Sequence, residues 1–191
     1  MPEQNSIEFH PKEQELIRKM RRRRSTDQDL EEMAYATGIV DQEVLETLQE
    51  LGYSPETVRL MPIIPLVQVA WAEGGVTPKE RELIMEIADS RGITPEMPAY
   101  DQLLTWLEQE PPPEFYTQTL RALRYVLESL PADLRIESRQ SLIEYCTQIA
   151  EVSGGILGFG KISDDERMLI ARIATEISQH RGAAVKKVIG E

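Results

Sequence analysis

Apolar residues recur along the chain at every third or fourth position, in segments separated by glycine, proline or short polar turns. This spacing places apolar side chains on one face of an α-helix, and no segment shows the alternation that is typical of a β-strand. We expect helices to end at Gly38, Gly52 and Gly92, because glycine readily adopts the left-handed conformation that closes a helix. The pattern predicts helices in segments 11–24, 26–38, 41–52, 61–73, 77–92, 94–110, 114–130, 137–155 and 163–182.

The predicted fold is all-α, a compact bundle of antiparallel helices with short connections. Segment 61–75 is almost wholly apolar, so we expect a buried central helix with Pro62 and Pro65 in its opening turn, where proline is tolerated. We expect residues 1–58 to form an N-terminal helical extension, made of a basic arm and an acidic helical hairpin. Residues 59–191 are expected to form the main helical domain.

One hairpin pattern occurs twice in the chain. The stretch AWAEGGVTPKERELIMEIA, residues 70–88, returns as AEVSGGILGFGKISDDERMLIARIA, residues 150–174, with six additional residues in its turn. Six of the nine residues from 80 to 88 are identical in the second copy. Each copy combines an apolar helix, a glycine turn and an amphipathic helix, and neither hairpin can bury its apolar face alone. We therefore expect two αα-hairpins related by pseudo-twofold symmetry.

The polar residues that follow each glycine turn have the form of a capping box. In this motif a hydroxyl and a glutamate side chain accept hydrogen bonds from each other's backbone amides. The two copies are Thr77 with Glu80 and Ser163 with Glu166. Such a cap stabilises a helix by about 1 kcal/mol. The main role that we expect for both glutamates is therefore structural.

Glu73 is not explained by capping. It lies at the C-terminal end of its predicted helix, where the helix dipole disfavours a negative charge, and a basic side chain or a divalent cation would relieve this. Calcium and magnesium bind carboxylate, carbonyl and water oxygens. Glu73 and Glu80 in the first turn, with Asp164 and Glu166 in the second, are therefore candidate metal ligands. Neither turn has the alternating acidic residues of an EF-hand loop.

Charge is distributed unevenly along the chain. The net charge is −12, yet residues 12–24 contain seven basic residues and only two acidic ones. An acidic surface would repel nucleic acid and anionic membrane and attract cations or basic partners. We expect the arginines of the basic arm to contact an acidic partner or the acidic body of the protein; these are Arg21, Arg22, Arg23 and Arg24.

Cysteine usage and hydropathy bear on the compartment. The only cysteine, Cys146, excludes an internal disulfide and lies in an apolar helical pattern, so we expect a small buried hydrophobic residue. The chain opens on a polar stretch, and no apolar run approaches the roughly 20 residues that span a bilayer. The sequence therefore predicts a soluble, cytoplasmic protein.

Catalytic signals are missing from the sequence. His10 and His180 are the only histidines, both near polar ends of predicted segments, and Cys146 has no evident histidine partner. The glycines of segment 154–160 are not followed by the lysine–hydroxyl pair of a phosphate-binding loop. We therefore do not predict an enzyme.

The N-terminal segment superficially resembles a helix-turn-helix. However, residues 27–58 contain no lysine or arginine, and a recognition helix needs basic residues to neutralise phosphates. A nucleic-acid-binding regulator, acting through the basic arm and this segment, is the alternative function and not the one we expect.

At the repeated turns the chain resembles the TerB-like family, which includes tellurite-resistance TerB and the N-terminal domain of DjlA co-chaperones. The family's "ADG" followed by a short "E-R" helix start is matched by AWAEGGVTPKERELI, and SGGILGFGKISDDER is similar to the second-half turn of larger bacterial members. The resemblance covers roughly residues 60–180. The family's usual aspartate before the glycine is Glu73 in the first half and Ser153 in the second, so the second half lacks that carboxylate.

The resemblance implies a compact helical protein with pseudo-twofold hairpins, associated with tellurite and other stress responses, and with suspected metal binding at the acidic turns. Together with the charge pattern it predicts a non-enzymatic binding or scaffold protein. The expected partners are other proteins, for example a membrane-associated stress complex or a second copy of this chain in a homodimer.

Overall fold

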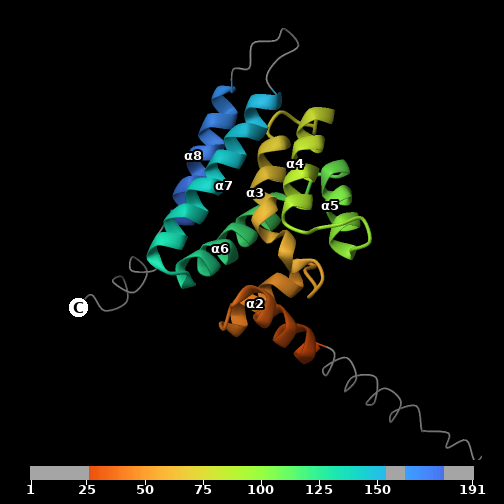
Figure 1. Cartoon of the computed structure of the whole chain (residues 1–191), viewed down its shortest axis with the longest axis vertical. Coiled ribbons are helices and arrows are strands. Elements are labelled where there is room, and N and C mark those ends of the chain that lie inside the picture. Colours follow the sequence, from red (N-terminus) through yellow and green to blue (C-terminus); the bar gives the residue numbers. More distant parts are fainter. Residues whose placement is uncertain (1–25, 154–161, 179–191) are drawn as a thin grey trace, which may run out of the picture.

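The structure, a computed structural model, describes residues 26–153 and 162–178, and every regular element within these ranges is helical. The predicted all-α fold is therefore confirmed. Residues 26–37 are helical at the start of the described part of the chain. The following elements, labelled in Figure 1, are α2 (Gln42–Glu50), the 3₁₀ helix η1 (Val58–Ile63), α3 (Ile64–Ala70), α4 (Pro78–Ser90), α5 (Pro98–Glu108), α6 (Pro113–Ser129), α7 (Ala132–Ser153) and α8 (Asp164–Ser178).

Glycine and proline set most of the helix boundaries. Gly38, Gly52 and Gly92 all have positive φ angles and follow helix ends, as predicted. Two predicted starts were wrong. α5 begins at Pro98, not at residue 94, because a proline disfavours the helical conformation in the residue before it, and Met97 is extended. α7 begins at Ala132, five residues before the predicted start, since the turn after Pro131 is already helical.

The buried central segment is shorter than predicted and is divided into two parts. Residues 58–63 form the 3₁₀ helix η1, which contains Pro62, and α3 follows with Pro65 in its first turn. Proline has no backbone N–H to donate, so Pro65 sits where the opening turn of α3 leaves that donor unpaired, whereas Pro62 lies inside η1, close to its end. The predicted burial is confirmed, since α3 contributes six buried residues to the core: Ile64, Pro65, Leu66, Val67, Val69 and Ala70.

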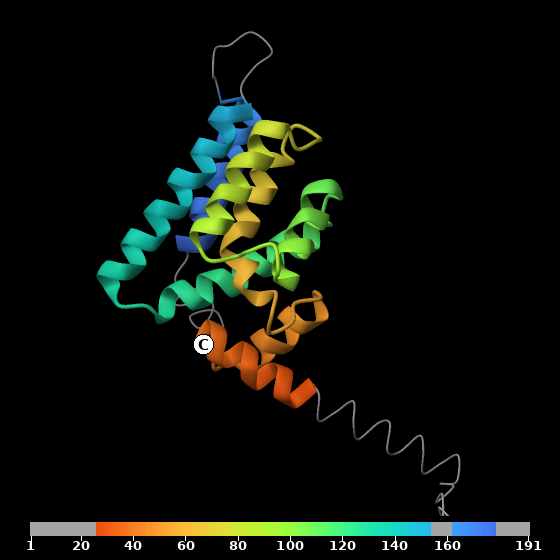
Figure 2. The ribbon, with the colours of Figure 1, turned by 45° about the vertical axis from the view of Figure 1, so that its right-hand side comes forward.

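α3 occupies the centre of the bundle. It contacts α4, α6, α7 and α8, and in Figure 1 it lies between α4 and the α7–α8 pair. α7 and α8 run side by side, while α6 crosses the bundle at a steep angle in both views (Figure 2). This arrangement leaves the C-terminal end of α3 flanked by α6 and α8, where the groove described below is found.

The N-terminal helices lie at one end of the bundle and share its core (Figures 1 and 2). Tyr53 connects them to the rest: its ring stacks on Phe115 at 5.6 Å and meets Trp106 edge-on at 5.8 Å. Its hydroxyl hydrogen-bonds the hydroxyl of Thr119 at 3.1 Å, and both residues are buried. The division at residue 58 into an extension and a main domain stays a prediction.

Some predicted features fall outside the described residues. These are the basic arm with Arg21 to Arg24, the glycine-rich part of the second turn (154–161), and the end of the last predicted helix with the tail beyond it. In the part of the chain that the structure describes, no helix is long and apolar enough to cross a membrane.

Candidate functional site

Both repeated turns form the capping boxes expected from the sequence. At the start of α4, the Thr77 amide donates to the Glu80 carboxylate at 2.7 Å, and the Glu80 amide donates to the Thr77 hydroxyl at 3.3 Å. At the start of α8, the Ser163 amide donates to the Glu166 carboxylate at 2.7 Å, and the Glu166 amide donates to the Ser163 hydroxyl at 3.2 Å. The glutamates therefore hold the two helix starts in the same way.

These two glutamates are buried, which capping alone does not require. Glu80 is 2% exposed and Glu166 is 1% exposed. Burial raises the pKa of Glu80 above its ordinary value, and the negative charges of Glu166 and Glu73 raise it further, while the hydrogen bonds from Thr77 act in the opposite direction. The carboxylates of the two turns thus lie within electrostatic range of each other, although they are far apart in sequence.

The two turns differ at the position that precedes the glycines. In the second turn, the Ser153 hydroxyl lies 2.7 Å from a Glu166 oxygen and 2.8 Å from the Ala150 carbonyl, and its proton serves both acceptors. In the first turn the matching residue is Glu73, which cannot donate a hydrogen bond when ionised and instead adds a negative charge near Glu80. The first turn is therefore the less compensated of the two.

The structure brings only some of the candidate metal ligands together. Glu80 and Glu166 lie in the interior and Glu73 is exposed nearby, whereas the Asp164 side chain is 92% exposed and pairs with Arg167 at 3.3 Å. Within residues 26–153 and 162–178, no group of three or more His, Cys, Asp or Glu side chains is placed to hold a metal ion.

Cys146 is completely buried, as predicted from its apolar surroundings. Burial raises the pKa of its thiol to about 12. The thiol therefore stays protonated at neutral pH and is a poor nucleophile, because the thiolate is the reactive form.

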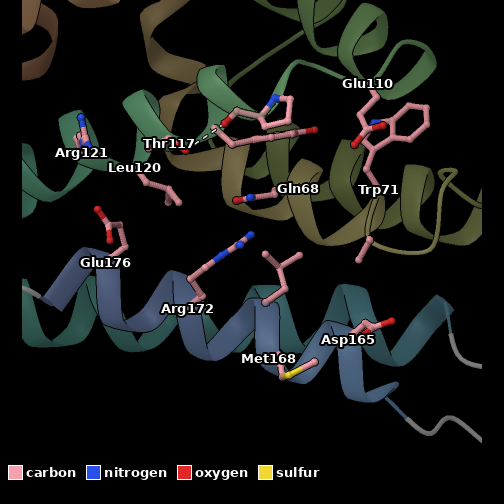
Figure 3. A pocket seen from close by; sticks show the side chains of 14 residues that line it. Gln68, Trp71, Glu110, Thr117, Leu120, Arg121, Asp165, Met168, Arg172 and Glu176 are labelled. Atoms are coloured by element: carbon pink, nitrogen blue, oxygen red, sulfur yellow. Dashed lines mark hydrogen bonds between the residues drawn. The ribbon is translucent and has the colours of Figure 1, made fainter.

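A groove that the sequence analysis missed lies between α3, α6 and α8 (Figure 3). Its volume is about 810 Å³, and sites for small molecules measure roughly 300–1,000 Å³. The end of α3 contributes Gln68 and Trp71, the first half of α6 contributes Tyr116 and Leu120, and α8 contributes Arg172. Helices distant in sequence thus combine to form one concave surface.

Two polar atoms of residues that line this groove are buried in the interior without any hydrogen-bond partner. They are the side-chain oxygen of Gln68 and the hydroxyl of Tyr116, a residue that is only 4% exposed. A buried polar atom without a partner destabilises a protein by roughly 1–3 kcal/mol. Burial, and secondly the charge of Glu110, raise the pKa of Tyr116, so its hydroxyl stays protonated and can donate.

The charged side chains around the groove, with two exceptions, have a partner or point away from its centre. Glu176 pairs with Arg124 at 4.0 Å. Arg121 hydrogen-bonds Gln118 at 3.4 Å and points away from the cavity in Figure 3. Asp165 also points away from the groove's centre, along α8.

Arg172 and Glu110 have no such engagement. They lie on opposite sides of the cavity and both point into it (Figure 3). Within the described ranges, neither makes a hydrogen bond or an ion pair with another side chain. Among the described residues, Arg172 and Glu110 are therefore the charged side chains that point into the groove without a partner, and two unpartnered polar atoms are buried in its wall.

One sequence signal pointed to this groove. Gln68 is the only polar residue in the otherwise apolar helix α3, and a polar side chain in a buried helix needs a partner. Tyr116 and Arg172 gave no comparable signal, because tyrosine and arginine are ordinary residues of amphipathic helices.

A scan against protein-family models, a search of curated proteins and a search of solved structures each returned no match.

Proposed function

We propose that this protein is a non-enzymatic binding protein and that the groove between α3, α6 and α8 is its ligand site. The observation that carries this proposal is the pair of unpartnered polar atoms, on Gln68 and Tyr116, in the wall of a cavity of about 810 Å³. A ligand that hydrogen-bonds both groups would remove the energetic cost of leaving them unsatisfied. No catalytic residue is needed for this role.

A fragment screen followed by amide NMR spectra tests the proposal. Fragments at millimolar concentration should shift the amide signals of residues around Gln68, Tyr116 and Arg172. The Ala72→Phe variant, which places a large ring in the groove, should abolish these shifts. Ala171→Phe, on an exposed part of α8 outside the groove, is the matched control and should leave them unchanged. Fragments that bind elsewhere only, or bind Ala72→Phe equally well, would contradict the proposal.

A divalent cation at the first acidic turn is the second candidate function. It is favoured by the electrostatic proximity of Glu73, Glu80 and Glu166, because a cation would offset the repulsion between these carboxylates. Among the described residues, no three of these side chains are placed to hold one ion, so such a site would hold at most two carboxylates. Backbone carbonyls and water would complete it. Titration with calcium or magnesium should raise the melting temperature and shift the amides of residues 73–80. The response should disappear in Glu73→Gln; no response at millimolar ion would eliminate the site.

The repeat and the TerB-like resemblance are the basis of a second part of the proposal, which concerns a duplicated hairpin and a role of the TerB type. Some matched positions have the same burial: Val69 and Ile149 are both buried, and Ile87 and Ile173 are both buried. At other matched positions the burial differs, since Ile84 is buried and Ile170 is only partly buried. The positions with the same burial support a duplicated hairpin with pseudo-twofold symmetry, and with it a stress-associated binding or scaffold role of the TerB type. Rotation of α3–α4 onto α7–α8 by about 180°, with matched residues superposed, is the measurement that tests the symmetry.

Protein partners are proposed to dock on the basic arm, at a membrane-associated stress complex or a second copy of the chain. Affinity capture with the full chain and with a variant lacking residues 1–24 tests this, and equal recovery of partners by both would remove the arm's role. Sedimentation of the purified chain tests the homodimer. Binding of duplex DNA at low salt, lost without the arm, would instead favour the nucleic-acid alternative.

A further inference from the structure

The chemistry of the groove restricts the ligand that would satisfy it. The Tyr116 hydroxyl is protonated and buried in the wall of the groove, so a ligand that reaches it must present a hydrogen-bond acceptor. Gln68 requires a complementary polar atom, because one atom of its amide faces the interior without a partner, whichever way the amide is turned. An apolar ligand alone would leave both groups unsatisfied.

Arg172 adds a requirement for negative charge. Its guanidinium points into the cavity between Gln68 and Leu120 (Figure 3) and is not neutralised by a carboxylate of the described residues. Guanidinium groups bind carboxylates through two parallel hydrogen bonds. A ligand carboxylate bound to Arg172 would also place hydrogen-bond acceptors on that side of the groove.

Glu110 adds the opposite requirement. Its carboxylate approaches from the other side of the cavity, above Trp71 (Figure 3), and its charge is felt by the hydroxyl of Tyr116. An isolated anion in the groove would be repelled by Glu110, and an isolated cation by Arg172. A ligand with both charges, separated in space, matches both side chains at once.

Apolar side chains also line the wall between these charges. Trp71 is held in place because its indole N–H donates to the Trp106 carbonyl at 2.9 Å, and Leu120 and Leu169 continue the apolar surface. The ligand therefore needs an apolar body of aliphatic or aromatic groups between its charged ends.

We infer, building on the ligand site proposed above, that the groove binds a small zwitterion with an apolar body, of the class of apolar amino acids and short apolar peptides. Arg172 binds the carboxylate, Glu110 binds the ammonium group, and Tyr116 and Gln68 hydrogen-bond the polar atoms between them. The apolar side chains lie against Trp71 and Leu120.

Calorimetric titration with a matched panel tests this inference. Leucine, dileucine and trileucine are each titrated as the free zwitterion, with the amine acetylated, with the carboxylate amidated, and with both ends blocked. At least one length should bind as the zwitterion about tenfold more tightly than either singly blocked form, the loss expected when one charged hydrogen-bonding end is removed.

Two variants assign the ends of the ligand. Arg172→Gln should abolish the preference for a free carboxylate, and Glu110→Gln should abolish the preference for a free amine. Arg167→Gln and Glu114→Gln, at exposed positions on α8 and α6 outside the groove, are the matched controls and should retain both preferences.

Failure of this inference is distinguishable from failure of the ligand site itself. Blocked and free peptides that bind equally well, or a panel without any binding while fragments still occupy the groove, would overturn the zwitterion assignment and leave the ligand site intact. Absence of both fragments and peptides from the groove would overturn both proposals. Preferences that persist in Arg172→Gln and Glu110→Gln would show that other residues bind the charged ends of the ligand.

Discussion

Substitutions at Glu80 separate the two roles of this buried carboxylate, the hydrogen bond that caps α4 and the charge that the interior disfavours. Glutamine retains an oxygen that can accept the bond from the Thr77 amide, and it is a regular member of capping boxes. Alanine removes both the acceptor and the charge. Comparison of Glu80→Gln with Glu80→Ala therefore measures the hydrogen bond together with the packing of the side chain, and comparison of Glu80→Gln with the wild type isolates the charge.

The structure sets the expected magnitudes. The bond from the Thr77 amide is 2.7 Å long and the Glu80 side chain is 2% exposed, so Glu80→Ala leaves a donor without a partner and a gap in the interior. Loss of the cap and of the acceptor should lower the free energy of unfolding by about 2 kcal/mol. Glu80→Gln keeps the bond and removes the repulsion from Glu73 and Glu166, so at pH 7 it should lie within about 0.5 kcal/mol of the wild type or be more stable.

The charge makes a pH-dependent contribution whose sign follows from the raised pKa of Glu80. Because the folded protein favours the protonated carboxyl more than the unfolded chain does, the stabilisation is complete below the ordinary pKa of 4.5. It is lost as the pH rises through the elevated pKa of the folded state. Between pH 4 and pH 8, the wild type should therefore lose stability relative to Glu80→Gln as the pH increases.

Urea unfolding followed by circular dichroism, at intervals between pH 4 and pH 8, provides these free energies. The matching substitution Glu166→Gln is the internal comparison, since the Glu166 carboxylate accepts a hydrogen bond from the Ser153 hydroxyl. The reasoning is refuted if the wild type and Glu80→Gln show parallel pH curves, or if glutamine destabilises as strongly as alanine at pH 7.

Other consequences of the structure are open to simple measurements. Glu73→Ser, which reproduces the second turn in the first, should raise the free energy of unfolding by about 1 kcal/mol at pH 7, because it replaces repulsion at Glu80 with a hydrogen-bond donor; a decrease in urea-unfolding experiments would oppose this. Tyr53→Phe and Tyr116→Phe should have opposite signs in the same assay: the first loses a buried hydrogen bond and should destabilise by about 1 kcal/mol, whereas the second removes an unpartnered hydroxyl and should be neutral or stabilising. Cys146 should not react with a thiol reagent in the folded protein and should react fully in urea; rapid labelling at neutral pH would contradict its burial.

Local physical chemistry explains why much of the fold was predictable. Helix ends at Gly38 and Gly52 follow from the conformational freedom of glycine, and the two capping boxes follow from a hydroxyl and a glutamate three residues apart. Both signals act within a few residues, so neighbouring residues are enough to read them. The predicted central helix was less accurate, because Pro62 and Pro65 favoured a 3₁₀ turn followed by a short helix.

The sequence by itself therefore determined the helical class, most helix boundaries, the caps and the burial of Cys146. Only the tertiary structure decided which charges face one another. It placed Glu80 near Glu166 and directed Asp164 toward solvent, although all three lie in the first turn of α4 or α8. It also brought Gln68, Tyr116 and Arg172 from three helices to one groove. Such proximity depends on how helices cross, and crossing is set by side-chain packing over the whole core, which no local pattern encodes.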